Sequence, residues 1–561
     1  MTIQKMKTTT FKKSTVDQWK EAATQSLRGK PLESLVTKTI EGIDLKPLYT
    51  LEDYEKRLHK KRSIKKDASW IIAQQTFGED GKDFLDRLRT SISRGNEAIV
   101  YDGTKQLVWD EVSQQELANL MKDYPVYLTN TKLDDPILNV FELVAPEERA
   151  AVTGAVSVKG WALPNGYANV KSVGADMWHA HHDGADAVTE LALALAIGAE
   201  QATNATDFAD FAAEFFVHFA VDTHFFMEIA KFRAFRICWQ AFCSAYDVTE
   251  APYIPVLATT SLRSYSKLDP YVNVLRAGNE TLAAVLGGAD MITVHPHTIL
   301  TGPTDSSIRI ARNIQLVIKE ETHIDKVIDP AGGTYFIETL TSELVEHAWV
   351  LFLEIEASGG YQAFDESGRL ATLLEERKAE VATGKKSLIG TNVYAELTDT
   401  TLTDWDGIQA VERLAGPFER LRTQFADEEI RTVLLTFGDL KDFKPRADFV
   451  SGFLATGGLQ SEWSPAFKNA EEANEWLAAE LPDYAIVCAT PAMTETVMEQ
   501  LLAGAPEKMI VDVAGKYDAA LEEKWLQAGL DGFIYAGQNK VDKLQRIFSL
   551  WNGGRVTDEQ A

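Results

Sequence analysis

Short apolar runs alternate with longer amphipathic segments from about residue 66 to residue 383. Eight of these runs are rich in β-branched residues and predict strands at 98–102, 126–129, 155–158, 170–175, 225–229, 254–259, 290–295 and 326–329. Several precede segments with helical spacing, such as 186–200. This alternation predicts an α/β fold with a parallel sheet, and eight units favour a (β/α)₈ TIM barrel over 66–383. The Gly- and Pro-rich stretch 159–169 is too short for a full crossover helix.

The same alternation returns in the last part of the chain. Apolar runs at 433–437, 485–489, 509–513 and 532–536 alternate with helical segments such as 492–503 and 517–528. This pattern predicts a flavodoxin-like, doubly wound parallel sheet over 431–561. The polar stretch 384–430 is expected to be a linker between the two units.

Residues 1–65 lack enough apolar positions for a core of their own. An amphipathic stretch at 16–27 is followed by a Gly-Lys-Pro breaker at 29–31 and an extended segment at 43–49. The apolar positions of this arm are Trp19, Ala22, Leu27, Leu32 and Leu35. We expect the arm to dock on a partner subunit, with packing on its own barrel as the alternative.

Charge and cysteine content exclude several classes of protein. The 561 residues include 83 acidic and 56 basic side chains, a net charge of −27 that disfavours binding to nucleic acid or an anionic membrane. Three cysteines, Cys238, Cys243 and Cys488, are too few for a disulfide framework and fit a reducing cytoplasm. Because no apolar window of about 18 residues occurs, we expect neither export nor membrane insertion.

Histidines cluster where predicted strands end. His179 and His181 follow the fourth predicted strand, and His295 and His297 end the seventh, so the four could converge on a metal ion. The simpler interpretation is a group of polar histidines lining a barrel mouth, since no carboxylate motif accompanies them. Two other histidines, His218 and His224, stand among apolar residues and are expected to serve packing or hydrogen bonding.

Arginines and paired glycines offer weaker signals. Arg233 and Arg236, spaced by three on one predicted helix, could clamp an anionic substrate or form ion pairs in this acidic chain. The glycine pairs at 287–288 and 332–333 are turn or close-packing signals, because neither belongs to a complete nucleotide-binding motif.

Four segments resemble the barrel of the methylmalonyl-CoA mutase family: LDPYVNVL at 268–275, LAAVLGGA at 282–289, RIARNIQ at 309–315 and IDPAGGTYF at 328–336. GIDLKPLY at 42–49 is similar to the family's amino-terminal arm, and the resemblance covers essentially the whole chain. It implies adenosylcobalamin-dependent interconversion of succinyl-CoA and methylmalonyl-CoA, by a CoA-threaded barrel joined to a flavodoxin-like cobalamin domain.

The chain departs from the family at the cobalamin motif. The family's Asp-x-His-x-x-Gly motif supplies the lower axial ligand of cobalt, whereas the corresponding loop at 438–447 contains no histidine. The resemblance places Phe443 at the ligand position and Arg446 at the glycine. Two further family motifs, Ser-x-Leu and Gly-Gly, correspond to residues 488–492 and 512–515.

The predicted barrel departs as well. The family's Arg-Gly-Arg-Pro-Trp-Thr type of segment, which closes over CoA, is replaced by KDASWIIAQQ at 66–75. The family's catalytic Tyr-His pair corresponds to Trp178 and His179, so we expect His179 to be a vestige of a catalytic residue.

These departures resemble the small, non-catalytic subunit of a heterodimeric mutase. The resemblance implies a large catalytic subunit as partner, adenosylcobalamin and a CoA ester in the complex, and no cofactor or metal on this chain. The alternatives are an independently active enzyme, either an unusual mutase or a metal hydrolase built on His179, His181, His295 and His297, and a chaperone of the mutase.

Overall fold

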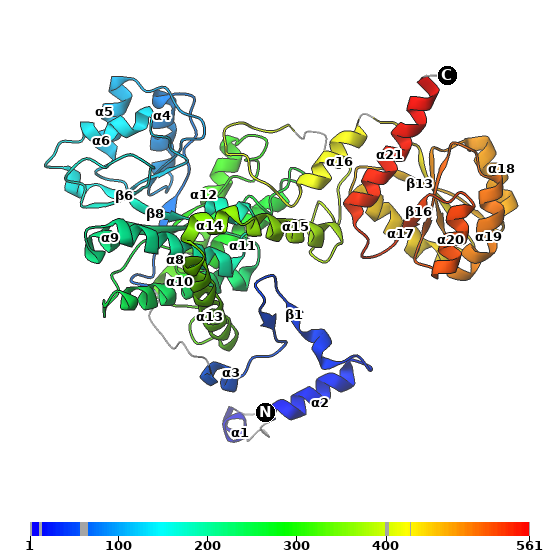
Figure 1. Ribbon diagram of the computed structural model, residues 1–561, viewed down its shortest axis with the longest axis horizontal. Coiled ribbons are helices and arrows are strands. Elements are labelled where there is room, and N and C mark those ends of the chain that lie inside the picture. Colours follow the sequence, from blue (N-terminus) through cyan, green and yellow to red (C-terminus); the bar gives the residue numbers. More distant parts are fainter. Residues whose placement is uncertain (1–2, 10–13, 57–64, 399–402, 427, 560–561) are drawn as a thin grey trace.

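The computed structural model describes residues 3–9, 14–56, 65–398, 403–426 and 428–559 and has an α/β fold with parallel sheets, as predicted (Figure 1). Parts of the predicted arm (1–2, 10–13, 57–64), of the linker (399–402, 427) and of the carboxyl end (560–561) lie outside the described residues. No helix in the described part is both long and apolar enough to cross a membrane.

Two parallel sheets form the larger unit. One has the order β3 (Ile71–Ala73), β11 (Met291–Thr293), β10 (Val256–Thr260), β9 (Phe215–Val221), β8 (Val173–Asp176), and the other β4 (Ile99–Asp102), β5 (Val126–Thr129), β6 (Thr153–Val156), β7 (Asn169–Lys171). The sheets meet at two places. Ser172 alone separates β7 from β8, and a parallel bridge joins Gln75, after β3, to Val100 of β4.

Helices and short 3₁₀ turns surround these sheets. The α-helices are α4 (Gly81–Ile92), α5 (Glu111–Leu120), α6 (Val140–Leu143), α7 (Trp178–His182), α8 (Ala187–Asn204), α9 (Phe208–Glu214), α10 (Phe225–Ala245), α11 (Val272–Gly287), α12 (Asp305–Thr322), α13 (Tyr335–Ala357), α14 (Gly360–Glu366) and α15 (Arg369–Ala382). The 3₁₀ turns around the sheets are η2 (Pro136–Asn139), η3 (Arg149–Ala151) and η4 (Ile324–Lys326), while η1 (Leu32–Leu35) belongs to the amino-terminal arm.

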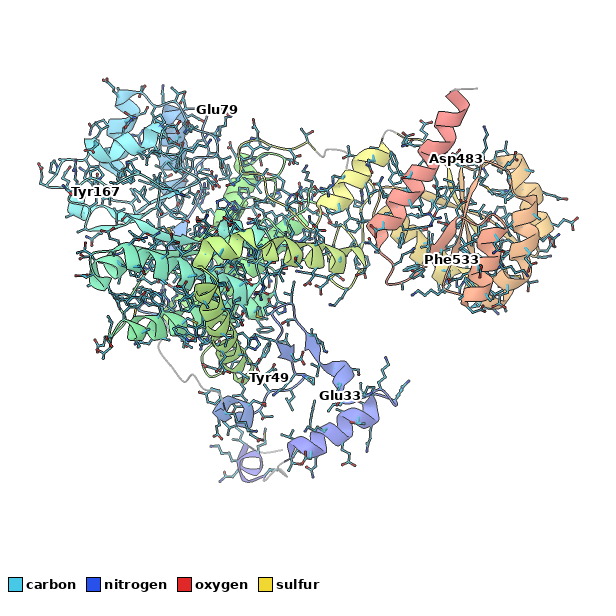
Figure 2. The ribbon with its side chains drawn as sticks, in the orientation of Figure 1. Glu33, Tyr49, Glu79, Tyr167, Asp483 and Phe533 are labelled. Carbon is cyan, nitrogen blue, oxygen red and sulfur yellow. The ribbon has the colours of Figure 1, made fainter. Side chains whose placement is uncertain are left out.

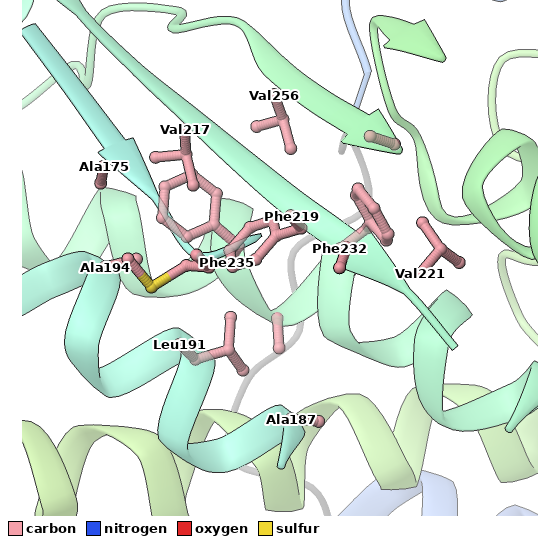
Figure 3. Close-up of a cluster of buried hydrophobic side chains, with 14 of the residues drawn as sticks. Ala175, Ala187, Leu191, Ala194, Val217, Phe219, Val221, Phe232, Phe235 and Val256 are labelled. Carbon is pink, nitrogen blue, oxygen red and sulfur yellow. The ribbon is translucent and has the colours of Figure 1, made fainter. Parts of the chain in front are cut away.

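The main core lies between the first sheet and helices α8, α10 and α13. Figure 3 shows Leu191 of α8 and Phe232 and Phe235 of α10 beside Val217 and Phe219 of β9. These helices are apolar around most of their circumference because both the sheet and neighbouring helices cover them.

Two predicted strands are wrong. The run at 225–229 begins helix α10, and the run at 326–329 is the end of η4 and the chain that follows it. A short, continuous apolar run has no periodicity that separates a buried strand from a buried helix, so the Phe-rich start of α10 was ambiguous. In the larger unit, the pattern missed β3 and the fully buried β9.

The carboxyl-terminal unit, residues 431–559, alternates strands and helices. Its elements are β12 (Thr432–Phe437), α17 (Leu440–Ala455), β13 (Ser461–Phe467), α18 (Ala470–Glu480), β14 (Tyr484–Cys488), α19 (Pro491–Gly504), β15 (Ile510–Ala514), α20 (Ala519–Gln527), β16 (Gly532–Ile534) and α21 (Lys540–Glu559). All five strands are parallel, in the order β13–β12–β14–β15–β16. Helix α21 packs against α16 (Gly416–Ala426) through an apolar cluster that contains Phe425 and Leu544.

The amino-terminal arm contacts the rest of the chain through its second half. It contains α1 (Ile3–Thr8), α2 (Val16–Ser26), the antiparallel pair β1 (Thr37–Lys38) and β2 (Asp44–Leu45), and α3 (Leu51–Lys56). Ile43 is 2% exposed in the main core, and the Tyr49 ring lies 4.8 Å from that of Phe336. Helix α2 has no buried residue and lies away from the body with Glu33 (Figures 1 and 2).

Candidate functional site

The carboxyl ends of the parallel strands surround a small polar cavity of about 30 Å³. Its lining includes Asp176, at the end of β8, His218 of β9, Thr259 of β10, Tyr127 of β5 and His295, which follows β11. The volume is enough for one or two water molecules. In parallel α/β folds this edge of the sheet is where sites are usually built, so these residues are the candidate site.

His218 connects a carboxylate to a hydroxyl. Its Nδ1 lies 2.8 Å from Asp176 Oδ1, and its Nε2 lies 2.8 Å from Thr259 Oγ1. Burial raises the pKa of Asp176, but the contacts with His218 and the Trp178 backbone N–H more than offset this, so the net shift is downward. The order hydroxyl, imidazole, carboxylate is that of a nucleophile, its base and the group that orients the base.

His295 also lines the cavity, and neither of its ring nitrogens is hydrogen-bonded to any described residue. Burial, followed by the proximity of His218, lowers the pKa of His295 to about 3, so its imidazole is neutral at pH 7. The Tyr127 hydroxyl and Thr293 Oγ1 also lack a hydrogen-bonding partner within the described ranges. The cavity therefore presents several polar atoms, but its size admits only very small molecules.

The four histidines of the predicted metal cluster do not converge. His179 is exposed, with Nδ1 3.4 Å from Gln409 Nε2, and the His297 ring stacks on Tyr271 at 5.4 Å. His181 is buried apart from the cavity and His295 lines it. Among the described residues, no group of three His, Cys, Asp or Glu side chains is arranged to hold a metal ion.

His181 instead belongs to a buried network that the sequence did not indicate. Its Nδ1 lies 2.7 Å from Glu190 Oε1 and its Nε2 2.8 Å from Ser261 Oγ, while Lys231 Nζ lies 3.0 Å from Glu190 Oε2. Burial and the nearby Arg263 lower the pKa of His181 well below its ordinary value. His181 and Ser261 are both fully buried, and neither belongs to the lining of the polar cavity, so this network lies in the interior apart from the candidate site.

The arginines of α10 form ion pairs. This was one of the two interpretations of the sequence, the other being a clamp for an anionic substrate. Arg233 contacts Asp329 and Glu338, and Arg236 Nη2 lies 2.6 Å from Asp290 Oδ2. These pairs are largely buried and connect α10 to neighbouring segments. His218 makes hydrogen bonds, as expected, although it does so in the wall of the polar cavity. The expectation for His224 is wrong in that this residue is exposed, directly before α10.

Phe443 lies in a helix and not in a loop. Helix α17 begins at Leu440, directly after the Gly438–Asp439 turn, and the Asp439 N–H donates to Asp442 Oδ2 at 3.2 Å. Phe443 is 5% exposed, and its ring meets the Trp463 ring edge-on at 5.7 Å. Its side chain is therefore part of the apolar core of the carboxyl-terminal unit.

Arg446, one turn further along α17, fills space beside the end of β15. Its Nη1 donates to the Ala514 carbonyl at 2.5 Å and to the Tyr517 hydroxyl at 2.8 Å. A side chain at Gly515 would approach this guanidinium to 3.1 Å. Cys488, the first residue of the other divergent segment, is fully buried, which raises the pKa of its thiol to about 12.

The segment 66–75 contributes strand β3 and a buried anchor. Trp70 is 3% exposed, and its Nε1 donates to Gln315 Oε1 on α12 at 3.2 Å. The segment is thus held into the sheet and against α12.

Comparison with known proteins relates the chain to one family. The family model described as methylmalonyl-CoA mutase matches residues 159–486. The methylmalonyl-CoA mutase small subunit of Porphyromonas gingivalis is 29% identical over 94% of this chain and 96% of its own length. A probable small subunit from Mycobacterium bovis is 31% identical (71% of this chain, 67% of the relative), and the methylmalonyl-CoA mutase of Cereibacter sphaeroides is 28% identical (72% and 68%).

Proposed function

Because the chain belongs to the methylmalonyl-CoA mutase family, we propose that it is the small, supporting subunit of a heterodimeric mutase. Its large partner binds adenosylcobalamin and the CoA ester and interconverts succinyl-CoA and methylmalonyl-CoA. Two of the relatives described above carry the name of small subunit, which implies a large one.

We assign the two sheets of the larger unit to one (β/α)₈ barrel over 66–383. Taking β7 and β8 as one interrupted strand, the two sheets provide eight parallel strand positions. The bridge between Gln75 and Val100, supported by a 3.0 Å bond from the Thr76 N–H to the Val100 carbonyl, brings the first and second positions together. Closure of this kind is the defining feature of a barrel.

The carboxyl-terminal unit is assigned to the flavodoxin-like class, connected by the linker 384–430. Numbered along the chain, its strands have the order 2-1-3-4-5, which is that of flavodoxin-like sheets. In the proposed heterodimer this unit is a domain of the cobalamin-binding type that no longer binds the cofactor.

The observation that carries the proposal is that side chains fill the barrel axis. Val100, Tyr127, Phe216, Leu257 and Met291, from five different strands, form one buried cluster. Above them remains the cavity of about 30 Å³, whereas ligand pockets usually measure about 300–1,000 Å³. A CoA ester has no channel here, so we infer that it binds to the partner subunit.

Cobalamin does not fit the carboxyl-terminal unit. Residues 431–561 contain no histidine, and the buried Phe443 ring offers no donor to cobalt. Arg446 fills the space beside Gly515, and the buried polar groups Asp512 and Lys543 lie within the same unit. We therefore assign the cofactor to the partner and derive no step through it on this chain. His179, exposed at the barrel mouth, is assigned no catalytic role.

The arm is assigned to the subunit interface. Trp19, Leu27 and Leu32 are only half-buried, Leu35 is exposed, and α2 has no buried residue. Apolar side chains of this kind are stabilised when a second surface covers them.

Co-expression with the large subunit of the same organism tests the proposal. The two chains should elute together in gel filtration at equal stoichiometry, with one cobalamin per two chains. The isolated chain, mixed with adenosylcobalamin, should retain no visible absorbance after desalting and should not turn over methylmalonyl-CoA. Retained cofactor or turnover would support an independent mutase, and loss of the chain from the active complex would support a chaperone.

A further inference from the structure

A second and larger cavity lies on the outside of the sheet, between helices α4 and α12. It measures about 360 Å³ and is lined by Gln74 and Thr76, at the end of β3, and by residues of both helices. Arg94, which follows α4, and Arg309 and Arg312, on α12, face it. We call this cavity the arginine pocket. It is separate from the barrel axis and from the surfaces used in the proposed function.

Arg312 is buried and forms no ion pair with any residue that the structure describes. It is 5% exposed, its Nη1 donates to the neutral Gln74 Oε1 at 2.8 Å, and its Nε has no hydrogen-bonding partner among the described residues. By contrast, the buried Arg263 forms an ion pair: its Nη2 lies 2.6 Å from Asp222 Oδ2. Because burying an unpaired charge is costly, the position of Arg312 indicates an anion that neutralises it when bound.

Arg94 and Arg309 increase the positive charge. Neither forms an ion pair with any residue that the structure describes, and both are exposed at the pocket. Burial, together with the charges of Arg94 and Arg309, lowers the pKa of Arg312, which is consistent with three guanidinium groups close to one another.

Three acidic residues, Asp83, Asp86 and Asp305, also line the pocket, against the four arginines Arg87, Arg94, Arg309 and Arg312. The acidic side chains lie beside arginines other than Arg94, Arg309 and Arg312. Arg87 lies 2.9 Å from Asp83 and 3.5 Å from Asp305, and Arg89 lies 3.8 Å from Asp86. The excess positive charge therefore remains on the side formed by Arg94, Arg309 and Arg312.

A buried hydroxyl without a partner provides a second, independent indication of a ligand. Thr76 is 6% exposed, and its Oγ1 makes no hydrogen bond within the described chain although it lines the pocket. Buried hydroxyls are nearly always hydrogen-bonded, so an unpartnered hydroxyl at a cavity wall indicates an acceptor inside the cavity.

We propose that the arginine pocket binds the phosphate group of a small phosphate monoester. A phosphate monoester carries close to two negative charges at pH 8 and has three acceptor oxygens, which suit bidentate guanidinium donors and the Thr76 hydroxyl. The volume exceeds that of a phosphate ion and leaves room for a small organic group.

Isothermal titration calorimetry on the full-length chain at pH 8 tests the proposal, with inorganic phosphate, glycerol 3-phosphate and succinate as probes. Inorganic phosphate and glycerol 3-phosphate should each bind with 1:1 stoichiometry, and succinate, a dianion of different geometry, at least tenfold more weakly. Equal affinity for succinate would overturn the assignment to phosphate. The absence of saturable phosphate binding would overturn the site.

Three variants place the binding in this pocket. Arg94→Gln and Arg309→Gln remove exposed charges without disturbing the core and should each weaken phosphate binding by roughly tenfold or more. Thr76→Val keeps the shape of the side chain and should weaken binding through loss of one donor. Arg546→Gln, which alters an exposed arginine on α21, should leave the affinity unchanged. Unchanged affinity in all three pocket variants would contradict the proposal, whatever the mutase activity of the complex.

Discussion

Lys543 Nζ on α21 lies 2.5 Å from Asp512 Oδ2 on β15, and the two side chains are only 4% and 0% exposed. The Tyr484 hydroxyl donates to the same carboxylate oxygen at 2.5 Å. The last helix of the chain is thus attached to the centre of the carboxyl-terminal sheet by a buried charge pair. In a domain that binds a cofactor against its sheet, such a region would need to be open.

Lys543→Met should destabilise the carboxyl-terminal unit by about 3–5 kcal/mol, because it leaves the Asp512 carboxylate buried and unpaired. The double variant Lys543→Met/Asp512→Asn should be less destabilised than this single variant, since the unpaired charge is removed as well. Hydrogen–deuterium exchange of the backbone amides of β14 and β15 measures the local stability of this unit.

Lys524→Met is the matched control for this pair. Lys524 contacts Glu499, but both side chains are more than half exposed, so its loss should cost under about 1 kcal/mol. Equal protection of β15 in Lys524→Met and Lys543→Met would show that the buried pair contributes no special stability.

Phe443→His should not create a cobalamin site. The side chain at 443 is directed into the core beside Trp463, and Arg446 still fills the space near Gly515. We expect the variant to retain no visible absorbance after incubation with adenosylcobalamin and desalting, like the unmodified chain. Circular dichroism controls for folding, and stoichiometric cofactor on a folded variant would contradict this view of the carboxyl-terminal unit.

Strands and helices with clear flanking signals could be predicted from the sequence, whereas ambiguous apolar runs could not. The runs at 126–129 and 485–489 coincide closely with β5 and β14. The error at 225–229 arose because α10 is buried on nearly all sides and shows no amphipathic period. Strand β13 was missed because it is an edge strand with mostly exposed side chains and contains Pro465.

The candidate site depended on information of a different kind. His218 is the single strongly polar residue in the apolar run of β9, two positions after the axis residue Phe216, and this alternation could have placed it inside the sheet. No sequence pattern could indicate that Arg312 has no carboxylate beside it among the described residues. Its neighbours in the fold come from distant parts of the sequence, the ends of β3 and α4. Likewise, the buried cluster of Val100, Tyr127, Phe216, Leu257 and Met291, which we assign to the axis of the proposed barrel, depends on five strands that are distant in sequence.

The free energy of unfolding should decrease as the pH drops below 6.5, and part of this decrease should depend on His295. Burial lowers the pKa of His295 to about 3 in the folded chain, against 6.5 for an ordinary histidine. Below pH 6.5 the unfolded chain therefore binds a proton that the folded chain does not. The free energy of unfolding should drop by up to about 1.4 kcal/mol per pH unit between these values, and about 2 kcal/mol should be lost at pH 5.

His295→Gln should remove this contribution, so urea unfolding at pH 7.5 and pH 5.0 should differ less in the variant than in the unmodified chain. His347→Gln, an exposed substitution on α13, should keep the full difference. If His295→Gln and the unmodified chain lost the same stability on acidification, the imidazole would not be held neutral by burial.

Removal of the exposed half of the arm should separate the proposed subunits without unfolding this chain. A truncation of residues 1–45 would delete Ile43, a core residue, so a deletion of residues 1–36 is the sharper test. It removes α2 and η1, neither of which has a buried residue, and keeps the contact between Tyr49 and Phe336. We expect an unchanged thermal transition and loss of the large subunit in a pull-down. A folded truncation that still retained its partner at full strength would assign the arm to this chain's own barrel.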